Sequence, residues 1–436
     1  MQNTKHLSRE LQQQSDAWLV SHDSKFDPLV YGTPPQRQLR RKAFGELTML
    51  VYIDRVLGTT GTLRPLSDLV LERTNEHRYY ELLLRNPSQF RLYAPSLAYV
   101  YALDELDQSA SDTLSFAINQ ESTWSKERKP CQLMDLSHVC KLSEQGERSP
   151  DMRTLIELSN QYNPPDIIES TLKMAYELTH NIFFWHHFGV DHPAYPSVPA
   201  PENANDRYPG LLLRYLADEN YDIALELLLS GVLQRTLSPV TVQLVLEEVT
   251  GVINEHGYVP GPQLDDDGVS GGDTLDDELN IDETDHLDEE VTSWRQHYHT
   301  TLVAAVVSRV LRAEWDDFVA ETQREDHDCS YGELISLGHV LRVFGDYDLE
   351  EGSQRLIEIS DSRVSDAFPI AFTSAISFLE RQRNQRGKYG YWTDERLLFT
   401  SKGSRAESFD EDLVAPVSEL CETAIREATR SHEHRH

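Results

Sequence analysis

Apolar residues recur at helical spacing along most of the chain. Residues 41–57 (RKAFGELTMLVYIDRVL) place their apolar side chains near one face, with the i, i+3, i+4 spacing of an amphipathic helix. Comparable stretches are 66–84, 96–106, 155–161, 166–188, 209–216, 221–237, 240–255, 291–322, 331–344, 349–360, 367–383 and 410–429. No segment reads convincingly as a strand, so the pattern predicts an all-α protein.

Most of the connections between these stretches are short and polar. Successive helices are therefore expected to pack as antiparallel hairpins, and about twelve helices give about six hairpins. The predicted fold is an α/α toroid that encloses a cavity. It occupies 36–429, after an N-terminal extension over 1–35 and before a frayed tail over 430–436. The acidic segment 263–290 (QLDDDGVSGGDTLDDELNIDETDHLDEE) is predicted to be a disordered insertion in this domain.

Two helix exits have similar sequences. Residues 252–262 (VINEHGYVPGP) and 378–392 (FLERQRNQRGKYGYW) each run from an apolar helix through polar residues to a glycine followed by an aromatic residue. Glycine permits a left-handed C-cap, and the aromatic residue that follows can fold back onto the helix. The exits indicate a degenerate hairpin repeat.

The charge of the chain is strongly asymmetric. Its 436 residues include 73 acids and 40 bases, a formal net charge of −33, and only nine of the bases are lysines. Self-repulsion of this size is screened in molar salt, where the Debye length falls to roughly 3 Å. The composition resembles that of proteins from salt-in halophiles and predicts a cytoplasm rich in potassium chloride. It argues against direct nucleic-acid binding, because there is no basic stripe to displace phosphate counterions.

Cysteine spacing and hydropathy suggest an intracellular protein. Cys131, Cys140, Cys329 and Cys421 are scattered and form no C-x-x-C pair, so neither a disulfide framework nor a cysteine zinc site is expected. The first residues, MQNTKHLSRELQQQSD, lack the apolar core of a signal peptide. No apolar run approaches the roughly 18 residues of a membrane span, so a soluble cytoplasmic protein is expected.

One short segment concentrates groups that could carry chemistry. Residues 177–192 read ELTHNIFFWHHFGVDH, with four histidines, a tryptophan and two acids. His180 and His187 are seven apart, near one face of a continuous helix, and are the candidates for a metal site, although the spacing differs from the HExxH zinc motif. The alternatives are a buried helix that ends at Gly189, with His186 and His187 near its C-terminal dipole, or a ligand pocket. No metal or cofactor is predicted.

The same segment carries a resemblance to a known family. YELTHNIFFWHHFG, from Tyr176 to Gly189, resembles the Tyr-x-Leu-Thr-His segment of an uncharacterised, helix-rich family of unknown function from actinobacteria and haloarchaea. NEHGYVPGP resembles a later element of that family, and together they extend the similarity over roughly 150–265. His186 and His187 stand where the family is expected to have Thr-Asp. The resemblance implies a helical toroid in an intracellular setting, with Glu177, Thr179 and His180 at the matching positions.

A broader resemblance concerns the architecture. Gln382, Gly387, Tyr389 and Trp392 look like the Gln…Gly-x-Trp repeats that brace the hairpins of triterpene cyclases and protein prenyltransferases. The Asp-x-Asp-Asp acid motif of the cyclases is not matched, and the prenyltransferase zinc ligands are not evident. No Gly-x-Ser-x-Gly, Walker loop or dinucleotide fingerprint occurs, which removes the commonest hydrolase, NTPase and Rossmann interpretations.

Two functions remain open from the sequence. The first is a binding or accessory protein whose cavity or concave face receives a peptide, lipid or protein, with Thr179, Trp185, His186, His187, Tyr389 and Trp392 as candidate binding residues. The second is an enzyme acting on a glycan, isoprenoid or peptide, with His180 and Glu177 as acid and base. Convergence of further acids or histidines beside His180 favours the enzyme, and an apolar or open groove favours binding. A toroid filled by its own side chains would instead be a structural scaffold.

Overall fold

All regular structure in the described part of the chain is helical. The computed structural model describes residues 2–59, 61–145, 147, 149–162, 166–190, 207–262, 289–322, 329–360, 362–386 and 419–430. Within these ranges no residue is assigned to a strand, which confirms the predicted all-α class. The predicted insertion at 263–290 and the tail at 430–436 lie almost entirely outside the described residues.

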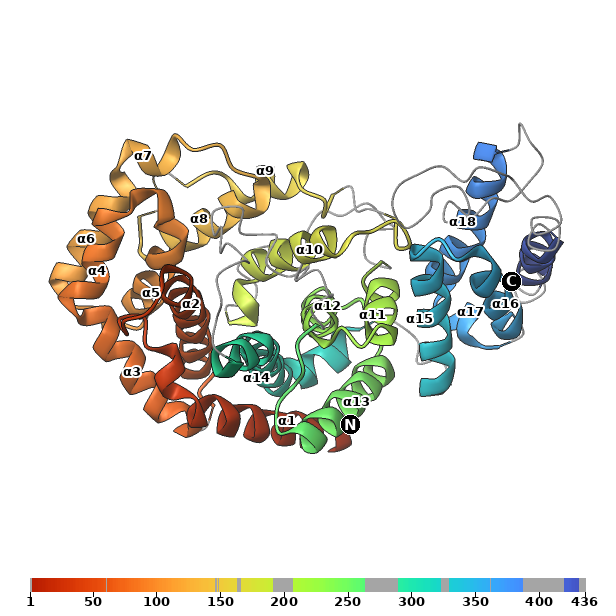
Figure 1. Ribbon diagram of the computed structural model, residues 1–436, viewed down its shortest axis with the longest axis horizontal. Helices are drawn as coiled ribbons and strands as arrows, with labels where there is room; N and C mark the ends of the chain where they lie inside the picture. The colour runs from red at the N-terminus through yellow and green to blue at the C-terminus, as the bar shows by residue number, and fades with distance from the viewer. Residues whose placement is uncertain are drawn as a thin grey trace.

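Figure 1 shows the helices in chain order. They are α1 (Gln2–Ser21), α2 (Pro34–Val56), α3 (Arg64–Asn75), α4 (His77–Arg85), α5 (Phe90–Ala102), α6 (Gln108–Asn119), α7 (Glu121–Trp124), α8 (Pro130–Leu142), α9 (Met152–Leu158), α10 (Leu172–Trp185), α11 (Arg207–Ala217), α12 (Tyr221–Leu233), α13 (Pro239–His256), α14 (Glu289–Glu321), α15 (Tyr331–Gly345), α16 (Leu349–Ile359), α17 (Val364–Ala367) and α18 (Pro369–Arg386). Residues 419–430 form a further helix. Short 3₁₀ turns include η1 (Asp23–Phe26), η2 (Gly61–Leu63), η3 (Pro87–Gln89) and η5 (His187–Gly189).

Six of these helices form a closed circuit of contacts. α2 packs on α5, α5 on α8, α8 on α10, α10 on α12, α12 on α14, and α14 returns to α2. We call these six the helix ring. Figure 1 shows α2, α10, α12 and α14 around the middle of the larger part of the molecule. Helices α15 to α18 are gathered at the right-hand end of the molecule in this view.

The remaining helices pack against the ring or against one another. α3 contacts α2, α6 contacts α5, α9 contacts α8, and both α11 and α13 contact α12. α15 reaches the ring through α11, and α16 and α18 pack on α15. Helices of the ring alternate along the chain with helices outside it. This order follows from the short connections, because consecutive helices then pack as pairs.

α1 is packed into this assembly although the sequence suggests only an extension over 1–35. It lies along α13 and α14 (Figure 1), and Leu11 and Leu19 are fully buried. Arg309 of α14 is also fully buried, and it donates from Nε to Asp54 of α2 at 2.8 Å and from Nη2 to Asp16 of α1 at 2.9 Å. These ion pairs join α1 and α2 to α14.

No helix was predicted where α6, α7 and α8 lie, and the boundaries of two predicted helices differ strongly from the observed ones. The predicted helix over 66–84 is two helices, because Glu76 adopts an extended conformation with ψ of 127° between α3 and α4. The predicted helix over 166–188 begins later and ends earlier, at Leu172 after its N-cap Thr171 and at Trp185. His187 and Phe188 follow with positive φ of 48° and 55°, which ends the helix before Gly189.

The glycine exit at the end of α13 is confirmed. Gly257 has φ of 80° and is the left-handed C-cap of α13, whose N-terminus is capped by the Ser238 side chain. A residue with a side chain is strained at this φ, so glycine suits the position. Tyr258 then stacks on His297 of α14, with ring centroids 4.2 Å apart. The corresponding exit at Gly387 lies outside the described residues.

Candidate functional site

A cavity of about 220 Å³ lies among the helices of the ring, and every ring helix contributes to its wall. Most of the polar lining residues come from four helices and one turn: Lys42 and Glu46 (α2), Gln89 (η3), Arg91 (α5), Asp135 (α8) and Glu226 (α12). Tyr99 of α5, Tyr176 and His180 of α10, and His299 of α14 complete the polar part. The site therefore depends on the ring being assembled from distant parts of the sequence.

Two histidines from different helices meet at one glutamate. Nε2 of His180 lies 3.7 Å from Oε2 of Glu226, and Nε2 of His299 lies 3.6 Å from Oε1 of the same carboxylate. The Glu226 side chain is only 2% exposed, whereas about a third of each imidazole is accessible. Because both histidines line the cavity, this accessible surface faces the cavity.

His299 is surrounded by carboxylates. Its Nδ1 lies 3.3 Å from Oε2 of Glu46, and its Nε2 lies 3.8 Å from Oδ2 of Asp222 in addition to the contact with Glu226. Burial opposes protonation of the ring, but the charges of Asp222 and Glu46 and contacts with Glu226 outweigh it and raise the pKa of His299 well above its ordinary value. The side chain of His299 is therefore a positively charged imidazolium within the helix ring.

The carboxylates are correspondingly ionised. Burial favours the neutral form of Glu226, yet the charges and contacts of His180 and His299 lower its pKa to about 2. The pKa of Glu46 is also lowered, because His299 and Lys42 outweigh the effect of its burial. Glu226 and Glu46 are acceptors only in this state.

Hydroxyl groups hold two of these carboxylates in place. Thr179 donates to Oε2 of Glu226 at 2.5 Å, and Thr300 donates to Oδ1 of Asp222 at 2.8 Å. The hydroxyl of Tyr176 donates to the other oxygen of Asp222, and burial is the largest cause that raises the pKa of Tyr176 well above its ordinary value. Fixed donors of this kind restrict the orientation of a buried carboxylate.

The rest of the cavity wall is largely apolar. Aromatic side chains come from α10 and η5, where Phe183 and Phe184 both contact Phe188, with centroids 5.4 and 5.8 Å apart. The positive φ of Phe188 turns the chain back after α10 and brings its ring against the helix it has left. Further apolar lining comes from Met49, Leu92, Pro95, Leu229, Leu302, Val303 and Val306. A ligand in this cavity meets charges at one part of its surface and hydrocarbon over the remainder.

A second charged pair lies at the wall formed by α5 and α8. Arg91 donates from Nε to Oδ2 of Asp135 at 2.7 Å, and both side chains are mostly buried. The pair brings no net charge to the cavity. Lys42 adds a positive charge near Glu46.

The predicted acid–base residues occupy different environments. His180 lines the cavity beside Glu226, and Thr179 contacts the same carboxylate. Glu177 does not line the cavity: its Oε1 pairs with Nζ of Lys129 at 3.1 Å. Trp185 is buried at the end of α10 and is not part of the cavity wall either.

The two histidines after α10 point to other partners. Nε2 of His186 lies 2.5 Å from Nε2 of Gln234, and Nε2 of His187 lies 2.8 Å from Nζ of Lys141. The spacing that relates His180 to His187 assumes a continuous helix, which α10 is not at that point. Among the residues that the structure describes, no group of three or more His, Cys, Asp or Glu side chains is arranged to hold a metal ion. Tyr389 and Trp392 lie outside the described residues.

Sequence reasoning missed most of the cluster around His180. In the HYH element at 297–299, His297 stacks on Tyr258, whereas His299 lines the cavity. Asp222 and Glu226 had a signal: they stand four apart in YDIALELLLSGVL, a helix whose residues are all buried. Two acids on one face of such a helix need partners.

The extent of a family match decides the classification. The family model described as Domain of unknown function (DUF6895) matches residues 12–309, which run from α1 into α14 and include every residue of the cavity wall. The chain belongs to this family. The match confirms the resemblance to a helix-rich family of unknown function, and it places the whole site inside the DUF6895 domain.

Comparison of this DUF6895 protein with curated proteins and with solved structures gave no match. No helix in the described part of the chain combines the length and apolar character needed to cross a membrane.

Proposed function

We propose that the DUF6895 domain is an α/α toroid of about six helical hairpins and that its cavity is an active site for proton transfer. The closed circuit of ring helices and the helices packed outside it support this architecture. The single observation that carries the function is the convergence beside His180. Glu226 from α12 lies beside His180, and His299 from α14 approaches the other oxygen of the same carboxylate.

His180 is the proposed proton carrier. Its Nε2 faces the ionised Glu226, which leaves the other ring nitrogen for a bound molecule. A carboxylate in this position fixes the tautomer and orientation of a histidine and stabilises its charged form. Glu226 is therefore a positioning residue, and Thr179 holds Glu226. His180 and His299 together keep Glu226 ionised, and the charge of His299 also keeps Glu46 ionised.

The cavity favours a small, largely apolar substrate. Its volume of about 220 Å³ exceeds that of the cavity of about 150 Å³ which binds benzene in an engineered protein. Glycan sites need many polar groups, whereas Phe183, Phe184 and Phe188 form hydrocarbon walls here. Of the proposed substrate classes, an isoprenoid fragment or an apolar peptide side chain suits these walls better than a glycan.

A probe reaction tests the function without the natural substrate. Elimination of 5-nitrobenzisoxazole requires only a base placed beside a small aromatic molecule, and its product is followed by absorbance. The wild-type protein is expected to catalyse this reaction with saturation. His180→Ala is expected to lower the rate by about a hundredfold or more. Glu226→Gln should also lower it, whereas His6→Ala, at an exposed histidine on α1, should leave it unchanged.

An equal rate in wild type and His180→Ala would contradict the proposal. A cavity that binds the probe, as measured by calorimetry, but gives no elimination would favour the second candidate function. That candidate is a binding protein for an apolar small molecule, the end of a lipid or a peptide side chain, and the apolar part of the wall supports it. The cavity is too small to admit a folded protein.

The cellular setting is also a proposal. The net charge of −33 and the excess of arginine over lysine support a cytoplasm of high salt concentration.

A further inference from the structure

A second hollow lies away from the central cavity and has the opposite electrostatic character. Its volume is about 430 Å³, and it is lined by residues of α2 and α4 and by the segment 28–31 that follows η1. Four arginines line it: Arg37, Arg41, Arg78 and Arg85. Glu81 is the one acid in its lining. In a chain with 73 acids and 40 bases, this local excess of positive charge is unusual.

Among the residues that the structure describes, two of these arginines have no acidic partner. Arg85 pairs with Glu81 at 2.7 Å, and Arg78 lies 3.6 Å from Glu76. In the described part of the chain, neither Arg37 nor Arg41 lies within ion-pair distance of a carboxylate. They stand one turn apart on α2, on the same face of the helix.

The unpaired arginines are held by neutral groups. Nη1 of Arg37 donates to the carbonyl of Gly32 at 2.6 Å, and Nη1 of Arg41 donates to the hydroxyl of Tyr93 at 2.9 Å. Nε of Arg41 is buried and has no hydrogen-bond partner. Both guanidinium groups are thus positioned while their charge is left uncompensated, an arrangement that suits an anionic ligand.

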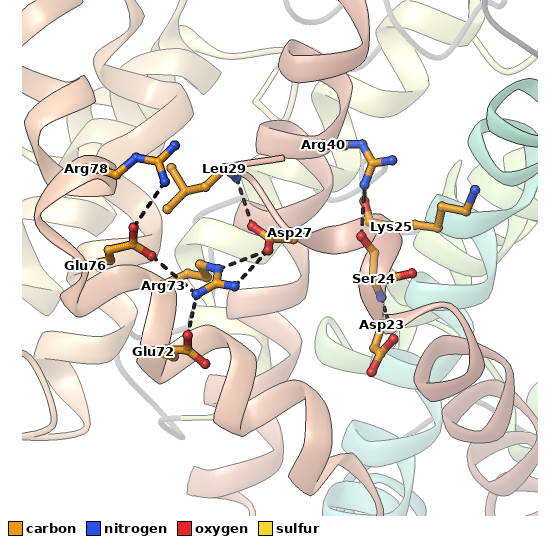
Figure 2. A network of polar contacts seen from close by, with 10 residues as sticks. All are labelled: Asp23, Ser24, Lys25, Asp27, Leu29, Arg40, Glu72, Arg73, Glu76 and Arg78. Carbon is orange, nitrogen blue, oxygen red and sulfur yellow. Dashed lines mark hydrogen bonds and ion pairs between the residues drawn. The ribbon is translucent and has the colours of Figure 1, made fainter. Parts of the chain in front are cut away.

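The segment 28–31, which forms one wall of the hollow, follows a residue that is held by α3. Figure 2 shows Arg73 between Asp27, Glu72 and Glu76, with Nη2 of Arg73 2.9 Å from Oδ2 of Asp27. Asp27 also accepts from the backbone N–H of Leu29 at 2.9 Å, and Leu29 lies beside Arg78 in this view. The charge of Asp27 is therefore used by Arg73 and does not neutralise Arg37 or Arg41.

The same wall exposes apolar and aromatic surface. Tyr31 is 88% exposed and Val30 is 38% exposed, next to the partly buried Leu29 and Leu82. Tyrosine offers a flat face for stacking at little cost in conformational entropy. The hollow thus combines guanidinium groups with an apolar edge.

We propose that this hollow binds a small, soluble phosphate ester, with the phosphoryl group on Arg37, Arg41 and Arg78 and its aromatic or apolar group against Tyr31. Guanidinium forks match the oxygen pairs of a phosphoryl group. A phospholipid headgroup offers the same chemistry, but the net charge of −33 opposes approach to an anionic bilayer. The site shares no residue with the central cavity, so it stands independently of the proposed catalytic function.

Calorimetric titration of the full chain with phenyl phosphate tests this site. One molecule is expected to bind per chain, more weakly in molar than in dilute potassium chloride. Arg37→Gln combined with Arg41→Gln should lower the affinity at least about tenfold. Arg78→Gln should weaken binding without a risk of unfolding, because this side chain is 57% exposed. Arg153→Gln, at an exposed arginine on α9 paired with Glu157, is the matched control and should bind as wild type.

The remaining measurements separate the parts of the proposal. Tyr31→Ala should weaken binding of phenyl phosphate and leave that of inorganic phosphate unchanged. Absence of binding by wild type, or equal affinity in the arginine variants, would overturn the proposal. A different result is sedimentation with phosphatidylglycerol vesicles, but not with phosphatidylcholine vesicles, together with no binding of phenyl phosphate. In that case the ligand would be a lipid headgroup and the proposal of a soluble ligand would be wrong.

Discussion

His299 is a charged group held inside a helical protein by its partners. Glu46, Asp222 and Glu226 approach both of its ring nitrogens, and they come from two other helices of the ring. Removing one member of a buried charged cluster leaves the others without compensation, which is more costly than never having buried them. The protonation of this cluster is therefore linked to the stability of the fold.

The cluster predicts how stability depends on pH. Glu226 and Glu46 have lowered pKa values, so their contribution is present above their ordinary value of 4.5 and is lost as the pH falls, for Glu226 through about 2. His299 has a raised pKa, so its contribution is complete below 6.5 and is lost as the pH rises through the raised value. Urea unfolding across pH should show losses at both ends.

The His299→Gln variant isolates the histidine. It should be less stable than wild type at neutral pH and should lose less further stability on the alkaline side. A variant with the alkaline loss of wild type would show that another group causes it.

Single residues of the site were visible in the sequence only where a local pattern marked them. His180 stands in a histidine-rich segment and was selected for that reason, whereas His299 and Glu46 sit in ordinary amphipathic helices. Their importance arises from partners that lie far away along the chain, such as Glu226 for His180 and Glu46 for His299. Local spacing carries no information about such pairs. The sequence likewise gave no sign that the carboxylate of Glu177 pairs with Lys129 and does not line the cavity.

At the scale of elements, α1 is joined to the ring by a buried charge. Arg309 binds Asp16 of α1 and Asp54 of α2, and Thr62 also donates to Asp16 at 2.6 Å. Burial is the largest influence on Asp16 and raises its pKa despite the arginine. The sequence predicted α14 closely, as 291–322, but gave no sign that polar residues of α1 and α2 pair with a buried arginine in it.

Replacing Arg309 by methionine should therefore destabilise the protein strongly. Two buried carboxylates would lose their counterion, which costs about 3–5 kcal/mol of the free energy of unfolding. The loss should shrink at mildly acidic pH, because burial raises the pKa of Asp16 and this carboxyl group can then take up a proton. Denaturant unfolding measures both effects, with Arg153→Gln as a surface control expected to cost less than about 1 kcal/mol. If Arg309→Met lost no more stability than this control, the proposed role of the ion pairs of Arg309 with Asp16 and Asp54 would be contradicted.

The prediction of helices succeeded better than that of their ends. Apolar periodicity located most of the helices, because most of them bury one stripe of residues and expose the other face. It could not see the extended Glu76 that separates α3 from α4, or the positive φ of Phe188 that ends α10 early. Both breaks occur at residues without strong turn preferences, so tertiary packing rather than local sequence decides them.

The whole molecule carries a large net negative charge, which is screened by dissolved salt but not by water alone. With 73 acids against 40 bases, repulsion among surface carboxylates opposes the compact state. The midpoint of thermal unfolding, followed by circular dichroism, is expected to rise by several degrees from dilute to molar potassium chloride. Sucrose, which does not screen charge, serves as the comparison. A midpoint that is unchanged or lowered by the salt would contradict the expectation of a high-salt setting.

The closure of the helix ring has a consequence for the order of events during synthesis. Asp54 and Arg309 are 255 residues apart, and α1 packs chiefly on α13 and α14. α1 therefore leaves the ribosome long before most of its permanent partners exist. Until then α1 exposes its apolar face, and the cavity is incomplete because part of its wall belongs to α14. Truncation of the chain after α13 would abolish function and leave an aggregation-prone intermediate rather than a smaller functional domain.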